Sequence, residues 1–192
     1  MATVGLNGKR SGRIHPQKFA LWVACASIVM MFAAMTSAYI VRQSGGNWLE
    51  FRMPDVFFYN TVVILLSSMT LHGAWIAFKK MKTKLYQGLL FASFILGLGF
   101  ILLQYEGWMQ LVDTGIELTT NPSSSFLYVI SGLHAAHVLG GVVAILIAFL
   151  VSIRDKHEVT PVRKLRLEMT AHYWHFVDAL WLYLYVFLLV QQ

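Results

Sequence analysis

The stretch HYWHFVDALWLYLYVFLLV, residues 172–190, decides how the chain is interpreted. It is long enough to cross a lipid bilayer as an α-helix, which takes about 20 residues at 1.5 Å rise per residue. Its first third nevertheless carries polar and aromatic side chains together: His172, Trp174, His175, Asp178 and Trp181. The stretch therefore predicts a membrane-spanning helix with a polar face near one end.

The carboxylate in this stretch indicates which face of the helix meets protein. Side chains three or four residues apart share a helix face, so Asp178 lies on the same face as Trp174 and His175. An ionised carboxylate facing lipid costs about 2.5–3.5 kcal/mol on insertion scales. We therefore expect Asp178 to lie in a helix interface, with His175 as its nearest partner, in a structural polar clamp. A metal, haem or proton-relay role is the alternative.

The composition is that of a membrane protein. The chain has 192 residues, of which 57% are hydrophobic and 12% charged, whereas a soluble domain has about 25% charged residues. Mean hydropathy is +0.61. The formal charge of +6 comes from basic residues placed between apolar runs, which does not favour nucleic-acid binding. The single cysteine, Cys25, forms no internal disulfide.

Four further apolar runs have the length that a bilayer requires. The five predicted helices cover approximately residues 19–41, 56–78, 86–110, 126–151 and 172–190. The apolar core of a signal peptide has about 7–15 residues. The first run is longer, so we interpret it as an uncleaved helix. The predicted fold class is all-α: one domain, residues 1–192, forming an integral membrane bundle of five transmembrane helices.

The distribution of Lys and Arg predicts the orientation of this bundle. Thirteen of the fifteen basic residues lie in the N-terminal segment and in the loops at 79–85 and 152–171, which alternating helices place on one side. Basic loops stay cytoplasmic. The N-terminus is therefore predicted to be cytoplasmic and the C-terminus to lie outside, on the periplasmic face.

Small residues recur every fourth position in the fourth predicted helix: Gly132, Ala136, Gly140, Ala144 and Ala148. Such a row forms a shallow groove that lets another helix approach closely. The row predicts helix packing, and it leaves open whether the neighbour belongs to this chain or to another subunit.

The histidines at membrane depth suggest structural roles. His134 and His137 lie three residues apart on one helix with no third ligand, which is a poor zinc site because zinc takes three or four protein ligands. We expect hydrogen bonds across helices, worth about 0.6 kcal/mol each on average in membranes. His72 and His175 are predicted at one depth on different helices, which motivates the alternative of a b-haem membrane anchor of a respiratory dehydrogenase. A small transporter is disfavoured because no internal repeat is present.

Two motifs carry a resemblance to a known family. Residues 173–178, YWHFVD, with Trp181 and Tyr185, and residues 132–137, GLHAAH, resemble the cytochrome c oxidase subunit III family of haem–copper terminal oxidases. The second motif is similar to the family's Gly-x-His-x-x-His pattern. The resemblance spans all five predicted helices and is to the five-helix bacterial form, which lacks two extra N-terminal helices.

This resemblance implies a non-catalytic subunit of a respiratory oxidase in the bacterial inner membrane. No cofactor is expected in this chain, because haem and copper belong to subunits I and II of such complexes. Packing on subunit I, phospholipid binding and support of sustained turnover and proton uptake are the implied roles. A small subunit IV and a larger respiratory supercomplex are further implied partners. Cytochrome c or a quinol would donate electrons to the other subunits.

The resemblance also assigns expected roles to individual residues. The polar clamp is expected to comprise His134, His137, His172, Trp174, His175, Asp178 and Trp181. Lys18 resembles a basic residue near a lipid headgroup, although an ordinary cytoplasmic anchor is the simpler interpretation. Ile28 stands where the family has a first-helix glutamate, so no role of that acid is carried over. Glu106 receives no role.

Overall fold

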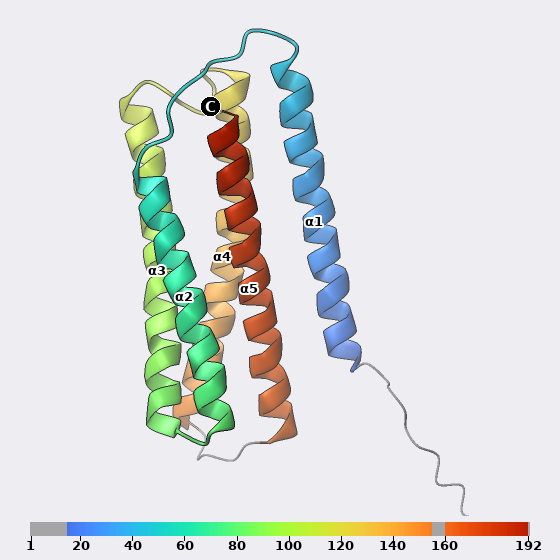
Figure 1. Ribbon diagram of the computed structural model, residues 1–192, viewed down its shortest axis with the longest axis vertical. Coiled ribbons are helices and arrows are strands. Elements are labelled where there is room, and N and C mark those ends of the chain that lie inside the picture. Colours follow the sequence, from blue (N-terminus) through green and yellow to red (C-terminus); the bar gives the residue numbers. More distant parts are fainter. Residues whose placement is uncertain (1–14, 155–159, 192) are drawn as a thin grey trace, which may run out of the picture.

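The computed structural model describes residues 15–154 and 160–191. Within them the chain forms five α-helices, each long and apolar enough to cross a membrane. They are α1 (Pro16–Gln43), α2 (Val56–Lys79), α3 (Thr83–Asp113), α4 (Pro122–Arg154) and α5 (Pro161–Val190). No strand occurs among these residues (Figure 1). The predicted all-α bundle of five spans is confirmed.

The beginning of α5 differs from the prediction, because this helix starts at Pro161 and not at His172. The Thr160 side chain accepts a hydrogen bond from the Arg163 amide at 3.3 Å, and Pro161 occupies the first turn. Both features favour a helix start at this point. Hydropathy detects the part of a helix that is apolar enough for lipid and misses a polar extension such as residues 161–171.

The start of α4 also differs from the prediction, because the helix begins at Pro122, one turn before residue 126. The Asn121 side-chain oxygen accepts a hydrogen bond from the Ser123 amide at 3.1 Å, so Asn121 caps the first turn. Proline and a preceding Asn are ordinary helix-start signals. Residues 121–125 have the composition of a loop, but most of them belong to the helix.

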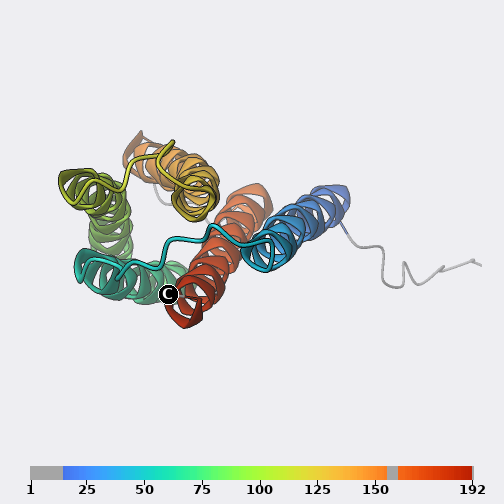
Figure 2. The ribbon, with the colours of Figure 1, turned by 90° about the horizontal axis from the view of Figure 1, so that it is seen from above.

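Helices α2 to α5 form a ring, and α1 lies outside it beside α5 (Figure 2). The most extensive packing is between α2 and α3, which are joined by a short turn. Within the described residues α1 contacts α4 and α5 but neither α2 nor α3. The first helix is therefore attached to one side of a four-helix body.

Large aromatic side chains fill the centre of this body. Trp174 and Trp181 of α5, Phe57 of α2 and Phe100 of α3 are all almost fully buried. The periphery carries exposed apolar side chains such as Met69 of α2, at 68% exposure. A water-soluble bundle would have polar residues there, so this periphery is suited to lipid or to apolar partner helices.

The connection between α1 and α2, residues 44–55, crosses the end of the bundle where the C-terminus lies (Figure 1). Asn121 holds it: its side-chain oxygen accepts from the Leu49 amide at 3.3 Å, and its side-chain amide donates to the Asn47 carbonyl at 3.1 Å. Trp48 lies edge-on against Tyr39 of α1, with ring centroids 4.6 Å apart. The connection thereby ties the end of α1 to the start of α4.

Candidate functional site

The predicted clamp around Asp178 is centred on a serine that the sequence analysis did not single out. His175 Nδ1 and the Ser68 hydroxyl of α2 are 2.5 Å apart. Asp178 is 6% exposed, and its Oδ1 has no hydrogen-bond partner within the described chain. Asp178 is thus buried among the helices of this chain. The described partner of His175 is Ser68, and the expected direct pairing of Asp178 with His175 stays a prediction.

His72 of α2 and His175 of α5 lie side by side in the structure. Their ring centroids are 5.9 Å apart, with His72 exposed on α2 and His175 half-buried on α5. Together with Ser68 they form the contact between α2 and α5 at this level. His172 does not join them: it is exposed, and its Nδ1 lies 2.7 Å from the Glu168 carbonyl of its own helix. His172 is therefore not part of the contact between α2 and α5, and its place in the clamp stays a prediction.

His134 is held by aromatic rings and not by hydrogen bonds. It is fully buried, and neither ring nitrogen has a hydrogen-bond partner in the part of the chain that the structure describes. Trp181 stacks on it, with centroids 5.0 Å apart and planes at 28°. Phe32 of α1 and Phe100 of α3 meet it edge-on at 6.3 and 5.9 Å. The hydrogen bond expected from His134 to another helix is thus replaced by an aromatic box.

Among the described residues, the His137 side chain makes its hydrogen bond within α4. Its Nδ1 lies 2.7 Å from the Leu133 carbonyl one turn back on α4. The ring meets Phe32 of α1 edge-on at 5.8 Å, and its backbone carbonyl accepts a hydrogen bond from the Tyr173 hydroxyl of α5 at 3.1 Å. His137 therefore contributes to the junction of α1, α4 and α5 through its ring face and its backbone.

Trp181 joins three helices around the aromatic box. Its indole N–H donates to the Thr61 hydroxyl of α2 at 3.0 Å. Its ring stacks on Phe57 of α2 at 6.4 Å and meets Phe100 of α3 edge-on at 5.1 Å. Trp181 therefore contacts α2, α3 and α4.

Trp174 fills a slot formed by two glycines. A Cβ added to Gly97 of α3 would lie 2.8 Å from Trp174 Cη2, and one added to Gly141 of α4 would lie 2.7 Å from its Cε3. Trp174 is therefore packed between α3 and α4. The predicted row of small residues includes Gly140, but this residue is exposed. A Cβ added to it would meet only the Tyr173 hydroxyl, at 3.8 Å. The close approach lies one position further along the helix.

Uncharged polar pairs join α2 to α3, and the search for histidines and acids missed them. The Asn60 side-chain amide donates to Gln104 Oε1 at 2.9 Å, and the Ser67 hydroxyl donates to the Ser93 carbonyl at 3.0 Å. Asn60 and Ser67 are seven residues apart, which keeps them on one helix face. The spacing of these two polar residues inside an apolar run is the feature of the sequence from which the contacts with α3 could have been predicted.

Contacts at three levels attach α1 to the rest of the bundle. At the start of α1, the Lys18 ammonium lies 2.6 Å from Glu168 Oε1 of α5. In the middle, Phe32 packs against the two α4 histidines. Near the end, the Thr36 and Tyr183 hydroxyls are 2.9 Å apart. Lys18 therefore has a protein partner, and its contact with a lipid headgroup stays a prediction.

The residues without an assigned role occupy unremarkable positions. Ile28 packs partly buried against the hydrophobic core, as an apolar side chain does. Glu106 is exposed and accepts a hydrogen bond from Gln110 at 3.3 Å on its own helix. Across residues 15–154 and 160–191, no group of three or more His, Cys, Asp or Glu side chains is placed to hold a metal ion.

Comparison with known proteins places these motifs in a family. Residues 17–191 match the family described as cytochrome c oxidase subunit III. A probable cytochrome c oxidase subunit 3 from Mycobacterium bovis is 27% identical over 197 residues, which cover 96% of each chain. One from Nocardia farcinica is 27% identical over 175 residues, covering 86% of this chain and 82% of the relative.

A longer relative shows the same likeness over part of its length. A probable cytochrome c oxidase subunit 3 from Rickettsia prowazekii is 31% identical over 137 residues, covering 71% of this chain and 48% of that protein. This chain thus spans about half the length of the Rickettsia relative. The family match covers all five helices, including the Trp174 slot, the His134 box and the Ser68 contact. The chain belongs to the cytochrome c oxidase subunit III family.

Proposed function

We propose that this chain is a non-catalytic membrane subunit that packs on subunit I of a haem–copper oxidase, holds phospholipids and supports sustained turnover and proton uptake. The observation that carries this proposal is the use of the motif side chains. Trp174, Trp181 and His134 are engaged by neighbouring helices of this same chain. Side chains that build helix contacts suit a scaffold.

The cofactors of the complex are proposed to lie in subunits I and II, with none in this chain. The observation that favours the opposite view is the proximity of the His72 and His175 rings. The absorption spectrum of the purified chain tests the proposal. A colourless chain is expected; a Soret band that disappears in His175→Ala would establish a haem and contradict it.

The proposed location is the bacterial inner membrane, with the N-terminus in the cytoplasm. The start of α1, the α2–α3 turn and the start of α5 lie at one end of the molecule (Figure 1). Lys80, Lys82 and Lys164 are exposed at that end. Positively charged ends remain in the cytoplasm, which supports this orientation. Cysteine labelling at positions 84 and 119 from either side of the membrane tests it, with labelling of 84 expected from the cytoplasm alone.

Partner association is the direct test of the proposed role. An affinity-tagged chain extracted in mild detergent is expected to bring down a haem–copper subunit I, with subunit II, and a small subunit IV or a larger respiratory supercomplex as further components. An untagged strain is the control for nonspecific capture. A tagged chain that is repeatedly recovered alone from membranes containing active oxidase contradicts the proposal.

The supporting role in turnover has its own measurement. Oxygen consumption by the oxidase is followed with this chain present and after its gene is deleted, with cytochrome c or a quinol supplied as the donor. We expect activity to decline faster during turnover without the chain. An identical time course and identical proton uptake in the two preparations contradict this role.

A further inference from the structure

The adjacent rings of His72 and His175 have no part in the proposed function. They belong to different helices, α2 and α5, and their centroids are 5.9 Å apart with the ring planes tilted by 54°. Two imidazoles bound to one metal ion, at about 2.0–2.1 Å for each bond from nitrogen to metal, have their ring centres roughly 5–6 Å apart. The observed separation therefore suits two ligands of a shared metal ion.

Ser68 leaves one particular nitrogen of His175 available to such an ion. His175 Nδ1 lies 2.5 Å from the Ser68 hydroxyl of α2. With the Nδ1 proton donated to that hydroxyl, Nε2 keeps a free lone pair, which is the usual arrangement of a histidine that binds a metal. Ser68 and His72 are four residues apart and share a face of α2. One helix face thus supplies a ligand and also the group that orients the other ligand.

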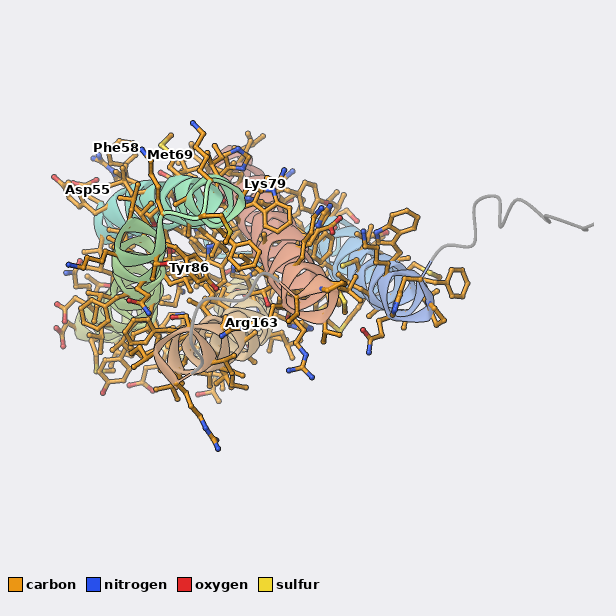
Figure 3. All side chains as sticks on the ribbon, turned by 90° about the horizontal axis from the view of Figure 1, so that it is seen from below. Asp55, Phe58, Met69, Lys79, Tyr86 and Arg163 are labelled. Carbon is orange, nitrogen blue, oxygen red and sulfur yellow. The ribbon has the colours of Figure 1, made fainter. Side chains whose placement is uncertain are left out.

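The pair lies on the outer surface of the bundle and not in its aromatic centre. His72 is exposed and His175 is half-buried. Met69, one turn before His72 on α2, is also exposed. Figure 3 places Met69 on the outside of the ring of helices, with Tyr86 and Arg163 inside it. Because an exposed imidazole can turn about its side-chain bonds, His72 can present a nitrogen to an ion bound at His175.

The position of the pair along the helices gives an ion access from water. Helix α5 has 30 residues, which make it about 45 Å long, whereas the hydrocarbon core of a bilayer is about 30 Å thick. The polar extension at 161–171 accounts for the excess, so His175 lies about one turn inside the apolar zone. On α2, His72 is seven residues from the helix end at Lys79. This step rests on the proposed membrane location.

The charged side chains near the pair favour a cation. Asp178 lies three residues after His175, on the same face of α5. It is buried, and its Oδ1 has no hydrogen-bond partner within residues 15–154 and 160–191. The Lys79 ammonium, two turns along α2 from His72, lies over the Trp75 ring at 4.6 Å from its centroid. A carboxylate beside the ligands would therefore attract a positive ion, while the cation on α2 is engaged elsewhere.

We propose that His72 and His175 bind one divalent transition-metal ion through their imidazole nitrogens, with Ser68 positioning His175 and water completing the coordination. Imidazole suits Zn²⁺ and Cu²⁺, and Cu²⁺ binds a given set of nitrogen ligands more tightly. A structural zinc site has about four protein ligands, so a site with two is open and its ion is exchangeable. The ion is therefore distinct from the redox cofactors that the proposed function places in subunits I and II.

Copper binding to the full chain tests this proposal. The chain is purified in mild detergent, without the subunits expected to contain copper, and is titrated with Cu²⁺. Pulsed electron paramagnetic resonance then counts the imidazoles on the ion. We expect one tightly bound ion with two imidazoles in the unaltered chain. His72→Gln and His175→Gln should each leave a single imidazole and weaken binding.

The matched control is His172→Gln, which removes a third imidazole from the same end of the molecule. The His172 ring is exposed, and its Nδ1 lies 2.7 Å from the Glu168 carbonyl of its own helix. This variant should change neither the affinity nor the imidazole count. Because His72 is also exposed, His72→Gln leaves the helix packing intact and remains decisive if a variant at a more buried position unfolds.

Ser68→Ala tests the positioning role separately. It keeps both ligands and removes the partner of His175 Nδ1, so the imidazole count should stay at two while the affinity for Cu²⁺ falls about 10–100-fold. Addition of Zn²⁺ to the copper-loaded chain distinguishes the two ions: loss of the copper signal identifies zinc as an occupant, and its retention identifies copper. Fewer than two imidazoles in the unaltered chain, equal weakening in all three histidine variants, or a Soret band in the purified chain would overturn the proposal. Capture of subunit I is measured on its own, so failure of the proposed function is observed separately.

Discussion

The indole of Trp174 lies directly against Gly141, where a Cβ would stand 2.7 Å from Cε3 and 2.9 Å from Cζ3. Real Cβ atoms do not approach other heavy atoms so closely, so α5 reaches this position only because α4 has a glycine there. Gly97 of α3 gives the same space on another side of the ring. The family-motif tryptophan therefore sets the spacing of three helices.

Gly141→Ala is expected to destabilise the bundle, because the added methyl group forces Trp174 or a helix to move. Overpacking of a filled core costs about 1–3 kcal/mol. Gly140→Ala is the matched control: its Cβ would meet only the Tyr173 hydroxyl at 3.8 Å, and Ala is the better helix former by about 1 kcal/mol. The Tm of the purified oxidase should fall in Gly141→Ala only. Equal Tm values for the two variants would contradict the slot.

The aromatic box predicts that His134 tolerates replacement by phenylalanine. His134 makes no hydrogen bond with the described residues, so His134→Phe removes buried polar atoms that are unsatisfied and keeps a ring stacked on Trp181. An unsatisfied buried polar group costs about 1–3 kcal/mol. The Tm of His134→Phe should therefore stay the same or rise.

The comparison variant for the box is Thr61→Val. It deprives the buried Trp181 indole N–H of its acceptor at 3.0 Å and should cost about 1–3 kcal/mol. Thermal unfolding of both variants in the same detergent measures the contrast. A lower Tm for His134→Phe than for Thr61→Val would show that the imidazole has a polar partner in the assembled oxidase.

The sequence was sufficient to predict the number and approximate limits of the helices, because lipid imposes a length and composition on each span. It also identified Trp174, Trp181 and Asp178 as buried, since large aromatic and charged groups in a polar-faced span favour an interface. These predictions follow from properties of one helix at a time.

Predictions that required knowledge of the opposing helix succeeded less well. The sequence places His134 at membrane depth, but it could not show that Phe32, Phe100 and Trp181 would surround the ring. The spacing of small residues selected Gly140, whereas the rotation of α4 presents Gly141 to Trp174. Rotation of a helix about its axis is set by packing between helices, and a one-residue shift moves a side chain by about 100°.

Asp178→Ala is expected to reduce retention of the chain in the oxidase more than Glu106→Ala does. Asp178 is buried, whereas Glu106 is exposed and bonds within its own helix. Removing a buried hydrogen-bonding group leaves its neighbours unsatisfied, at about 1–3 kcal/mol. Quantitative immunoblotting of the purified complex measures retention of each variant. Equal retention would show that Asp178 makes no important contact.

The ion pair between Lys18 and Glu168 predicts that a charge swap restores what single reversals lose. The single variants Lys18→Glu and Glu168→Lys each oppose like charges at a 2.6 Å contact and should loosen the start of α1. The side chains are 33% and 25% exposed, so the pair is screened and its coupling should not exceed about 1 kcal/mol. The double swap should recover the Tm, and added salt should shrink all differences. A swap as unstable as Lys18→Glu alone would instead indicate that Lys18 binds an anionic lipid head, as the resemblance implies.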